Sequence, residues 1–337
     1  MRFSLFTEKS LSALDPSVSR LLWVLVVRFV FPLCIAISTP AVHACSPTEL
    51  STLLREAQEA ESRGAWRNLE TTGERAVVLC SKDGAGYHWL GLAYLRRGNT
   101  FAAVRAFRAA LQFGGIATSH LRLAEAYFVL SQDRFFEEEI AAAKSASPDD
   151  PEPYYVEGRF FFQRKQMFAK AEELYRKALS KDPVHVKSLT HLALCLRNMQ
   201  QDEEPELLLK KSIEKIEKIE KIDALDTSYY LPYQLLATLY LDRNKSGLAL
   251  PLILRAAKMA PEVAENHFLM GKIQLAQNDD SGAEASILRA MKLDEALVEG
   301  HYLLARIYRD RGDTVAANRE LNTFKERKEL YGTRRLR

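Results

Sequence analysis

The sequence predicts an all-α protein, built as a solenoid of about eight helical hairpins placed side by side. Three observations lead to this fold class. A pattern of small, bulky and aromatic residues returns every thirty-odd residues through almost everything after residue 45. No stretch alternates apolar and polar residues for long, as a half-buried strand would. Gly (15) and Pro (12) are sparse among the 337 residues, which argues against disorder and collagen-like structure.

The clearest copy of the pattern has Gly91 and Tyr94 in one helix and Ala103, Phe107 and Ala110 in the next. Further copies contain Leu123, Ala124, Tyr127, Ile140 and Ala143; Tyr155, Phe162, Ala171, Tyr175 and Ala178; Tyr233, Leu236, Ala237, Tyr240, Ala249 and Ile253; Met270, Gly271, Ala283 and Ile287; and Leu304, Ala305, Tyr308, Ala317 and Leu321. Small residues let two antiparallel helices approach closely, and the aromatic rings fill the space between hairpins. Pro often follows the second helix and ends it.

These residues resemble the tetratricopeptide repeat, a 34-residue helix–turn–helix unit. The resemblance implies a right-handed superhelix and covers almost everything after Cys45. The units expected from the register are 50–83, 84–116, 117–150, 152–185, 186–219, 230–263, 264–297 and 298–331, with a helical insert at 214–229 and a basic tail at 332–337.

Two departures from the pattern concern the third and fourth units. Phe136 and Arg159 occupy positions where the repeat usually has a small residue. A large side chain at such a position keeps neighbouring helices apart. We therefore expect looser or shifted packing where these two units meet.

Residues 1–44 form a segment ahead of the repeats. It contains a short apolar run, Phe29–Ile37, preceded by Arg20 and Arg28, which suits a secretory signal peptide but is too short to span a bilayer. Val42 and Ala44 fit cleavage before Cys45. Three interpretations stay open: a cleaved signal, a lipoprotein acylated on Cys45, and an uncleaved membrane anchor. All three place the repeats outside the cytoplasm, in the periplasm or as a secreted protein.

The cysteines suggest a disulfide bond in the first unit. Cys45 precedes the first helix and Cys80 ends the second, and antiparallel helices bring those two ends together. Acylation of Cys45 would exclude this bond because it uses the same sulfur. Cys195 lies within a predicted first helix and is expected to be a buried free thiol.

Several kinds of chemistry find no support in the sequence. The net charge is +3, and the residues after 44 carry 43 basic and 42 acidic side chains, so nucleic acid is not expected as a partner. There is no zinc-protease motif, C-x-x-C pair, phosphate-binding loop or nucleophile elbow. His120, His267 and His301 fall where the repeat prefers a large ring, so we interpret them as packing groups rather than metal ligands. No catalytic residue, metal site or cofactor is predicted.

The resemblance implies that the first helix of each unit lines a concave groove. Apolar residues at solvent-facing positions there would form a recognition surface, and the basic members suggest a partner with some acidic character. The expected groove residues are His88, Leu92, Leu95, Arg96, Leu121, Phe128, Phe160, Arg164, Leu194, Arg197, Phe268, Lys272, Tyr302 and Arg306. The Lys and Asn clamp of chaperone-tail binders is absent, because those positions hold residues such as His88 and Glu125.

The sequence therefore predicts a non-catalytic adaptor that binds a peptide or protein in this groove. One alternative is a structural protein of the cell envelope that self-associates, through the end carrying residues 318–330. The other is an enzyme with a cryptic site.

Overall fold

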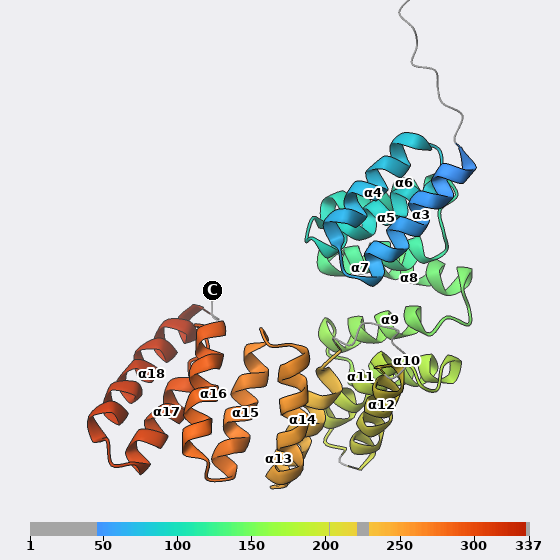
Figure 1. Ribbon diagram of the computed structural model, residues 1–337. Coiled ribbons are helices and arrows are strands. Elements are labelled where there is room, and N and C mark those ends of the chain that lie inside the picture. Colours follow the sequence, from blue (N-terminus) through green and yellow to red (C-terminus); the bar gives the residue numbers. More distant parts are fainter. Residues whose placement is uncertain (1–45, 202, 221–228, 335–337) are drawn as a thin grey trace, which may run out of the picture.

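A computed structural model describes residues 46–201, 203–220 and 229–334 of the chain. These residues form sixteen helices and no strand (Figure 1). The helices are α3 (Pro47–Ser62), α4 (Trp66–Leu79), α5 (Gly84–Arg96), α6 (Thr100–Gln112), α7 (Thr118–Val129), α8 (Asp133–Ala146), α9 (Pro151–Gln163), α10 (Phe168–Lys181), α11 (Val186–Asn198), α12 (Glu204–Glu220), α13 (Leu231–Asp242), α14 (Ser246–Met259), α15 (Ala264–Ala276), α16 (Asp280–Leu293), α17 (Glu299–Asp310) and α18 (Thr314–Arg334). Successive pairs make eight hairpins, which confirms the predicted fold class.

Capping side chains and tight turns fix where the helices begin and end. The carboxylate of Asp83 accepts a hydrogen bond from the amide of Ala85 and starts α5, and Asn99 caps α6 in the same way. In each hairpin one residue of the turn between the two helices has a positive φ. In chain order these turn residues are Gly64, Gly98, Ser131, Gln166, Gln200, Asn244, Asn278 and Gly312. The left-handed conformation ends the first helix and reverses the chain.

Small residues bring the two helices of a hairpin into close contact. A Cβ atom added at Gly91 would lie 2.8 Å from the Phe107 ring, and one added at Gly271 would lie 2.7 Å from Ile287. Such distances leave no room for a side chain, so the small residues of the repeat set the spacing between the helices.

A continuous apolar core joins the hairpins. It runs from Ala57 in α3 to Ile273 in α15, and smaller clusters continue it at both ends. The first helices of neighbouring hairpins touch each other from α3 to α15, whereas the second helices make no comparable contact in the described chain. The first helices therefore lie along the inner side of a curved array (Figure 1).

The joint between α8 and α9 is the sparsest contact between any two successive helices in the described chain. Phe136 of α8 and Phe160 of α9 meet there with their rings stacked at 4.4 Å, and both side chains are 0% exposed. Looser packing between the third and fourth hairpins was expected, and Phe136 acts as predicted because its ring stands between the helices.

The prediction that Arg159 occupies the small position of its repeat is wrong, because the turn after α9 contains one extra residue. In this turn the amide of Met167 donates to the carbonyl of Phe161, six residues back. In each of the other seven hairpins the corresponding hydrogen bond spans five residues, as the bond from the amide of Asn99 to the carbonyl of Tyr94 does. The extra residue moves the register of α9 by one position, so Gly158 rather than Arg159 takes the small position. A Cβ atom at Gly158 would lie 2.6 Å from the Tyr175 ring.

The inserted segment 214–229 is described only in part. Helix α12 continues through residue 220 and is 17 residues long, against 13 or 14 for α6, α8 and α10. This agrees with the expected lengthening of that second helix. The connector after it, residues 221–228, lies outside the described residues.

Candidate functional site

The inner surface is the side of the array formed by the first helices α5, α7, α9, α11, α13, α15 and α17. Four predicted groove residues do not open onto it. The side chains of His88, Leu92 and Leu121 are at most 3% exposed, and Phe160 is fully buried. The prediction of a solvent-facing position is wrong for these four.

Two physical causes account for the four buried residues. The first helices α5 and α7 contact each other, and His88, Leu92 and Leu121 lie buried on these two helices. His88 also forms a hydrogen bond with Ser119 at 2.9 Å, and burial lowers its pKa to about 4. Phe160 is buried because the register of α9 is shifted by one residue, which turns this ring toward α8.

The other predicted groove residues are open to solvent in part or in full. Arg96, Arg164, Lys272, Tyr302 and Arg306 are exposed. Leu95, Phe128, Leu194, Arg197 and Phe268 are partly buried.

Several of these residues have intramolecular partners. Arg197 pairs with Asp242 at 2.8 Å, which ties α11 to the end of α13. Lys272 lies 6.0 Å from the ring of Phe268, a cation–π distance. Arg164 is the C-cap of α9 and lies 3.4 Å from Asp133, so it stands at the turn end of the fourth hairpin.

The register shift places two unpredicted residues on the inner side of α9: Tyr155, which is buried, and Arg159, which is partly buried. They occupy in α9 the positions that His88 and Leu92 hold in α5. The Arg159 guanidinium carbon lies 5.6 Å from the ring centroid of Phe128 and 5.9 Å from that of Tyr155. We call Phe128, Tyr155 and Arg159 the Arg159 cluster. No sequence motif marks it, because the extra turn residue lies in a polar segment without glycine.

The acidic groups beside the Arg159 cluster are already paired. Glu125 of α7 accepts a hydrogen bond from Arg122 at 2.8 Å. Burial alone would raise the pKa of Glu152 in α9, but the hydrogen bond from His185 and the ammonium of Lys187 outweigh it and lower the pKa to about 2. Each of the two carboxylates thus has a cationic partner within the chain.

His191 of α11 completes the surroundings of the cluster. Its imidazole packs edge-on to the Tyr155 ring at 5.1 Å. Burial lowers its pKa to about 4, and the charge of Arg159 contributes in the same direction. His191 is therefore neutral at pH 7.

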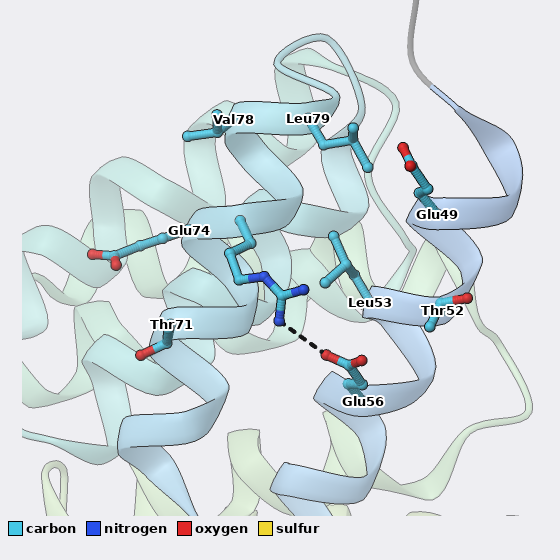
Figure 2. A pocket seen from close by; sticks show the side chains of 9 residues that line it. Glu49, Thr52, Leu53, Glu56, Thr71, Glu74, Val78 and Leu79 are labelled. Atoms are coloured by element: carbon cyan, nitrogen blue, oxygen red, sulfur yellow. Dashed lines mark hydrogen bonds and ion pairs between the residues drawn. The ribbon is translucent and has the colours of Figure 1, made fainter.

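The outer face of the first hairpin has a shallow hollow of about 620 Å³ between α3 and α4 (Figure 2). Its walls carry the carboxylates Glu49, Glu56 and Glu74, and Glu56 faces Arg75 across it at 3.2 Å. Val78 at its edge is 85% exposed. This face lies where a preceding hairpin would pack in a longer array.

The last hairpin has a smaller pocket, about 190 Å³, between α17 and α18. Tyr302, Arg306 and Arg309 line it from α17, and Asn318 and Leu321 line it from α18. Two of the predicted groove residues, Tyr302 and Arg306, thus lie together in one pocket with a basic and aromatic wall.

The histidines have partners of other kinds. His120 and His301 each contact a glutamate of the following helix at 2.7 Å, and His267 contacts the carbonyl of Pro261 at 2.8 Å. No group of three or more His, Cys, Asp or Glu side chains in the described chain could hold a metal ion. None of the described helices has the length and apolar character needed to cross a membrane.

The predicted disulfide bond involves a residue outside the described part of the chain. Cys80 is buried at the end of α4, beside Leu50 and Leu53. Cys45 directly precedes Ser46, the N-cap of α3, but is not itself described. The bond between them stays a prediction. Cys195 is a free, buried thiol as predicted, and burial raises its pKa to about 11.

The sequence model for the tetratricopeptide repeat matches residues 235–297, which span α13 to α16 except for the first few residues of α13. No curated protein sequence matches the chain.

Solved structures with a similar fold are all distant in sequence. One is the Cut9–Hcn1 hetero-tetramer of the APC/C, with a TM-score of 0.66 and 12% identity over 74% of this chain and 48% of that one. Another is PilF from Pseudomonas aeruginosa, with a TM-score of 0.55 and 20% identity over 66% of this chain and 97% of that one. A tetratricopeptide repeat protein from Parabacteroides merdae has a TM-score of 0.52 and 19% identity over 77% of this chain and 99% of that one. At these identities the comparisons show the fold.

Proposed function

Because the chain is a tetratricopeptide repeat protein, we propose that it is a non-catalytic scaffold that binds a peptide or protein partner along its inner surface. Proteins of this fold generally mediate protein–protein interactions, and the family is typically non-catalytic. We further propose that the repeats work outside the cytoplasm, since residues 1–44 have the composition of an export signal or anchor.

One observation carries the binding proposal. Exposed cations and rings gather on the inner surface of the last two hairpins, where Lys272, Tyr302 and Arg306 are exposed and Phe268 is half-buried. Rings and arginines are the side chains that most often dominate protein interfaces. In α5 and α7 three of the four corresponding side chains, His88, Leu92 and Leu121, are buried. We therefore place the main contact with the partner on the C-terminal half of the inner surface.

Site-specific photo-crosslinking tests this proposal. A benzophenone amino acid is introduced at Lys272 or Tyr302 on the inner surface, and at Phe101 or Leu288 as controls on second helices. All four positions are exposed, so the reactive group is accessible in each variant. We expect a discrete crosslinked partner from the inner positions only. Equal crosslinking from Phe101 and Leu288 would show that the partner does not use the inner surface.

A second candidate function is self-association end to end. Two observations favour it: Val78 is 85% exposed at the first hairpin, and Val315 is 80% exposed in the last. Contact between such ends of two copies would be heterologous and could extend into a filament. Size-exclusion chromatography with light scattering separates the two functions. A monomer at all accessible concentrations would exclude self-association, and a Val78→Glu variant should dissociate any oligomer that forms.

A further inference from the structure

We propose that the convex side of the sixth and seventh hairpins is the interface of a homodimer, in which a second copy of this chain packs antiparallel on α14 and α16. The convex side is the side of the array opposite the inner surface. Two copies joined there keep their inner surfaces open, so the inference goes beyond the binding function proposed above. The contact also differs from end-to-end association, because a two-fold contact closes on itself and joins two copies only.

The first argument is the composition of the outer stripe of each second helix, the row of exposed residues at i, i+4, i+7 and i+11 that faces away from the core. In α14 and α16 the outer stripes are Gly247, Pro251, Leu254 and Lys258, and Ser281, Ala285, Leu288 and Lys292. All of these residues are exposed, and the two central positions of each stripe carry no charge. In every other second helix at least one of the two central positions is charged; these side chains are Glu74, Arg105, Arg108, Glu138, Glu173, Arg176, Lys210 and Arg319.

Two neighbouring helices thus share an uncharged surface on the solvent side. Leu254 is 50% exposed and Leu288 is 47% exposed. A helix face that stays in water normally carries charged or polar residues. Exposed apolar side chains that gather on neighbouring elements instead mark an interaction site. The convex side of α14 and α16 therefore has the composition of a surface that another molecule covers.

The second argument identifies that molecule as a second copy. In both outer stripes the leucine follows a more compact residue by one turn. When α16 is laid antiparallel on α16 of a second copy, Leu288 lies over Ala285 of the second copy and Ala285 lies under its Leu288. Large side chains then meet compact ones at both contacts, as close packing requires. The same two-fold axis places Leu254 over Pro251 of the second copy, because both stripes use equivalent positions of neighbouring repeats.

The third argument is charge, which selects the antiparallel orientation. In a parallel two-fold arrangement α14 would lie on α16 of the second copy, and Lys258 would face Lys292 there. Like charges so close to each other are unfavourable. In the antiparallel arrangement Lys292 lies opposite Ser281 of the second copy and beside Asp280, at the N-terminal end of that helix. Opposite charges then meet at both edges of the α16 pair.

The size of the surface sets the expected affinity. Helices α14 and α16 have 14 residues each, so each is about 21 Å long. Two helices about 10 Å wide offer roughly 400 Å² per copy, against about 800 Å² per partner in a standard stable interface. We therefore expect a weak dimer with a Kd in the micromolar range.

Disulfide trapping tests the orientation with the full-length chain. Ser281→Cys and Lys292→Cys are oxidised separately and as an equal mixture. In the antiparallel dimer Ser281 faces Lys292 of the second copy, whereas each position lies about 16 Å from its own equivalent, beyond the ~7 Å limit for a disulfide. We expect a bonded dimer from the mixture only, and none from the wild type, which controls for the native cysteines. A mixture that stays unbonded overturns the inference, and so does equal bonding in the single variants.

Light scattering over a concentration series tests the apolar contact. Leu288→Glu should raise the Kd of the dimer roughly 10-fold or more, because it brings two like charges to the centre of the interface. The control Phe101→Glu changes a ring that is 67% exposed on α6 and should leave the Kd unchanged. Circular dichroism melting verifies that both variants are folded.

Two outcomes of the light scattering overturn the inference: a wild type that is monomeric at roughly 100 µM, or a dimer that Leu288→Glu leaves unchanged. Neither outcome affects the proposed partner on the inner surface. In the photo-crosslinking experiment the dimer would give Leu288 a product of twice the chain mass with the purified protein alone. That mass and the absence of a second protein distinguish the product from a crosslinked partner.

Discussion

Replacing Phe136 by Ala should separate the unfolding of the first three hairpins from that of the last five. The Phe136 ring is the main filling of the α8–α9 joint, where it stacks on Phe160 at 4.4 Å and is 0% exposed. A repeat array is stabilised by each hairpin and by the interfaces between neighbours. Removing the ring weakens one interface, and that interface is already the sparsest in the described chain.

The magnitude follows from burial. Truncating a buried Phe to Ala costs about 3–5 kcal/mol, which includes the cavity it leaves. The lost ring pair accounts for about 0.5–1.5 kcal/mol of that. Elsewhere in the array such a loss would destabilise one hairpin and its neighbours together. At this joint we expect it to remove most of the coupling between the two parts.

Two spectroscopic probes can follow the two parts separately. Trp66 and Trp89 both precede the joint, so tryptophan emission reports the first hairpins once Trp23 is replaced by Phe. Circular dichroism at 222 nm reports all the helices. In urea we expect the two signals to coincide for the parent protein and to separate in Phe136→Ala. The control Phe101→Ala removes a ring that is 67% exposed and should leave them together. Coincident transitions in Phe136→Ala would refute the proposed role of this joint.

Three further predictions concern pH, packing and the disulfide bond. Burial lowers the pKa of His88 and His191 to about 4, below the value near 6.5 in the unfolded chain. Between these two pH values the unfolded chain binds more protons than the folded one, so the free energy of unfolding falls as the pH falls. Each histidine should cost about 2 kcal/mol between pH 7 and 5 in urea titrations, and His191→Gln should remove its share; an unchanged pH dependence would contradict this. Gly158→Ala should destabilise the protein by about 1–3 kcal/mol because its Cβ meets the Tyr175 ring, whereas Gly247→Ala, with open space around it, should be neutral or slightly stabilising; equal melting temperatures would show that the close approach at Gly158 is relieved at no cost. Intact-mass analysis of the exported protein should find a chain that begins at Cys45 and is lighter by two hydrogens until reduced, and Cys80→Ser should cost about 3–4 kcal/mol; a mass that includes acyl chains would exclude the bond.

The sequence was sufficient to predict the hairpins because their spacing depends on local residues. Gly91 and Phe107 must meet for two helices to pack, and both lie within one unit. The helix contacts within a hairpin can therefore be predicted from the sequence of that one unit. The same reasoning predicted that Phe136 would loosen the joint with the next hairpin, and the structure agrees.

The register of α9 was predicted one residue off, because its aromatic positions fit two registers equally well, although Gly158 at the small position favours the observed one. Tyr154 and Tyr155 are adjacent, and so are Phe161 and Phe162, so a shift of one residue still places a ring at each aromatic position. The extra turn residue decides between the two registers. The repeat pattern also could not predict which side chains of the inner surface are exposed. It depends on how closely neighbouring first helices approach, and that distance is set by the curvature of the whole array rather than by any single unit.

The turn residues with positive φ have a consequence for how the array resists fraying. Five of the six hairpins with two neighbours are closed by Ser131, Gln166, Gln200, Asn244 and Asn278, for which this conformation costs roughly 1 kcal/mol or more, and the sixth is closed by Gly98. The terminal hairpins, closed by Gly64 and Gly312, avoid that penalty. In the described chain the outermost units have one neighbouring hairpin each and have relaxed turns, and all five strained turns belong to hairpins with a neighbour on both sides. This distribution evens out the local stability along the chain and favours concerted melting over unravelling from the tips.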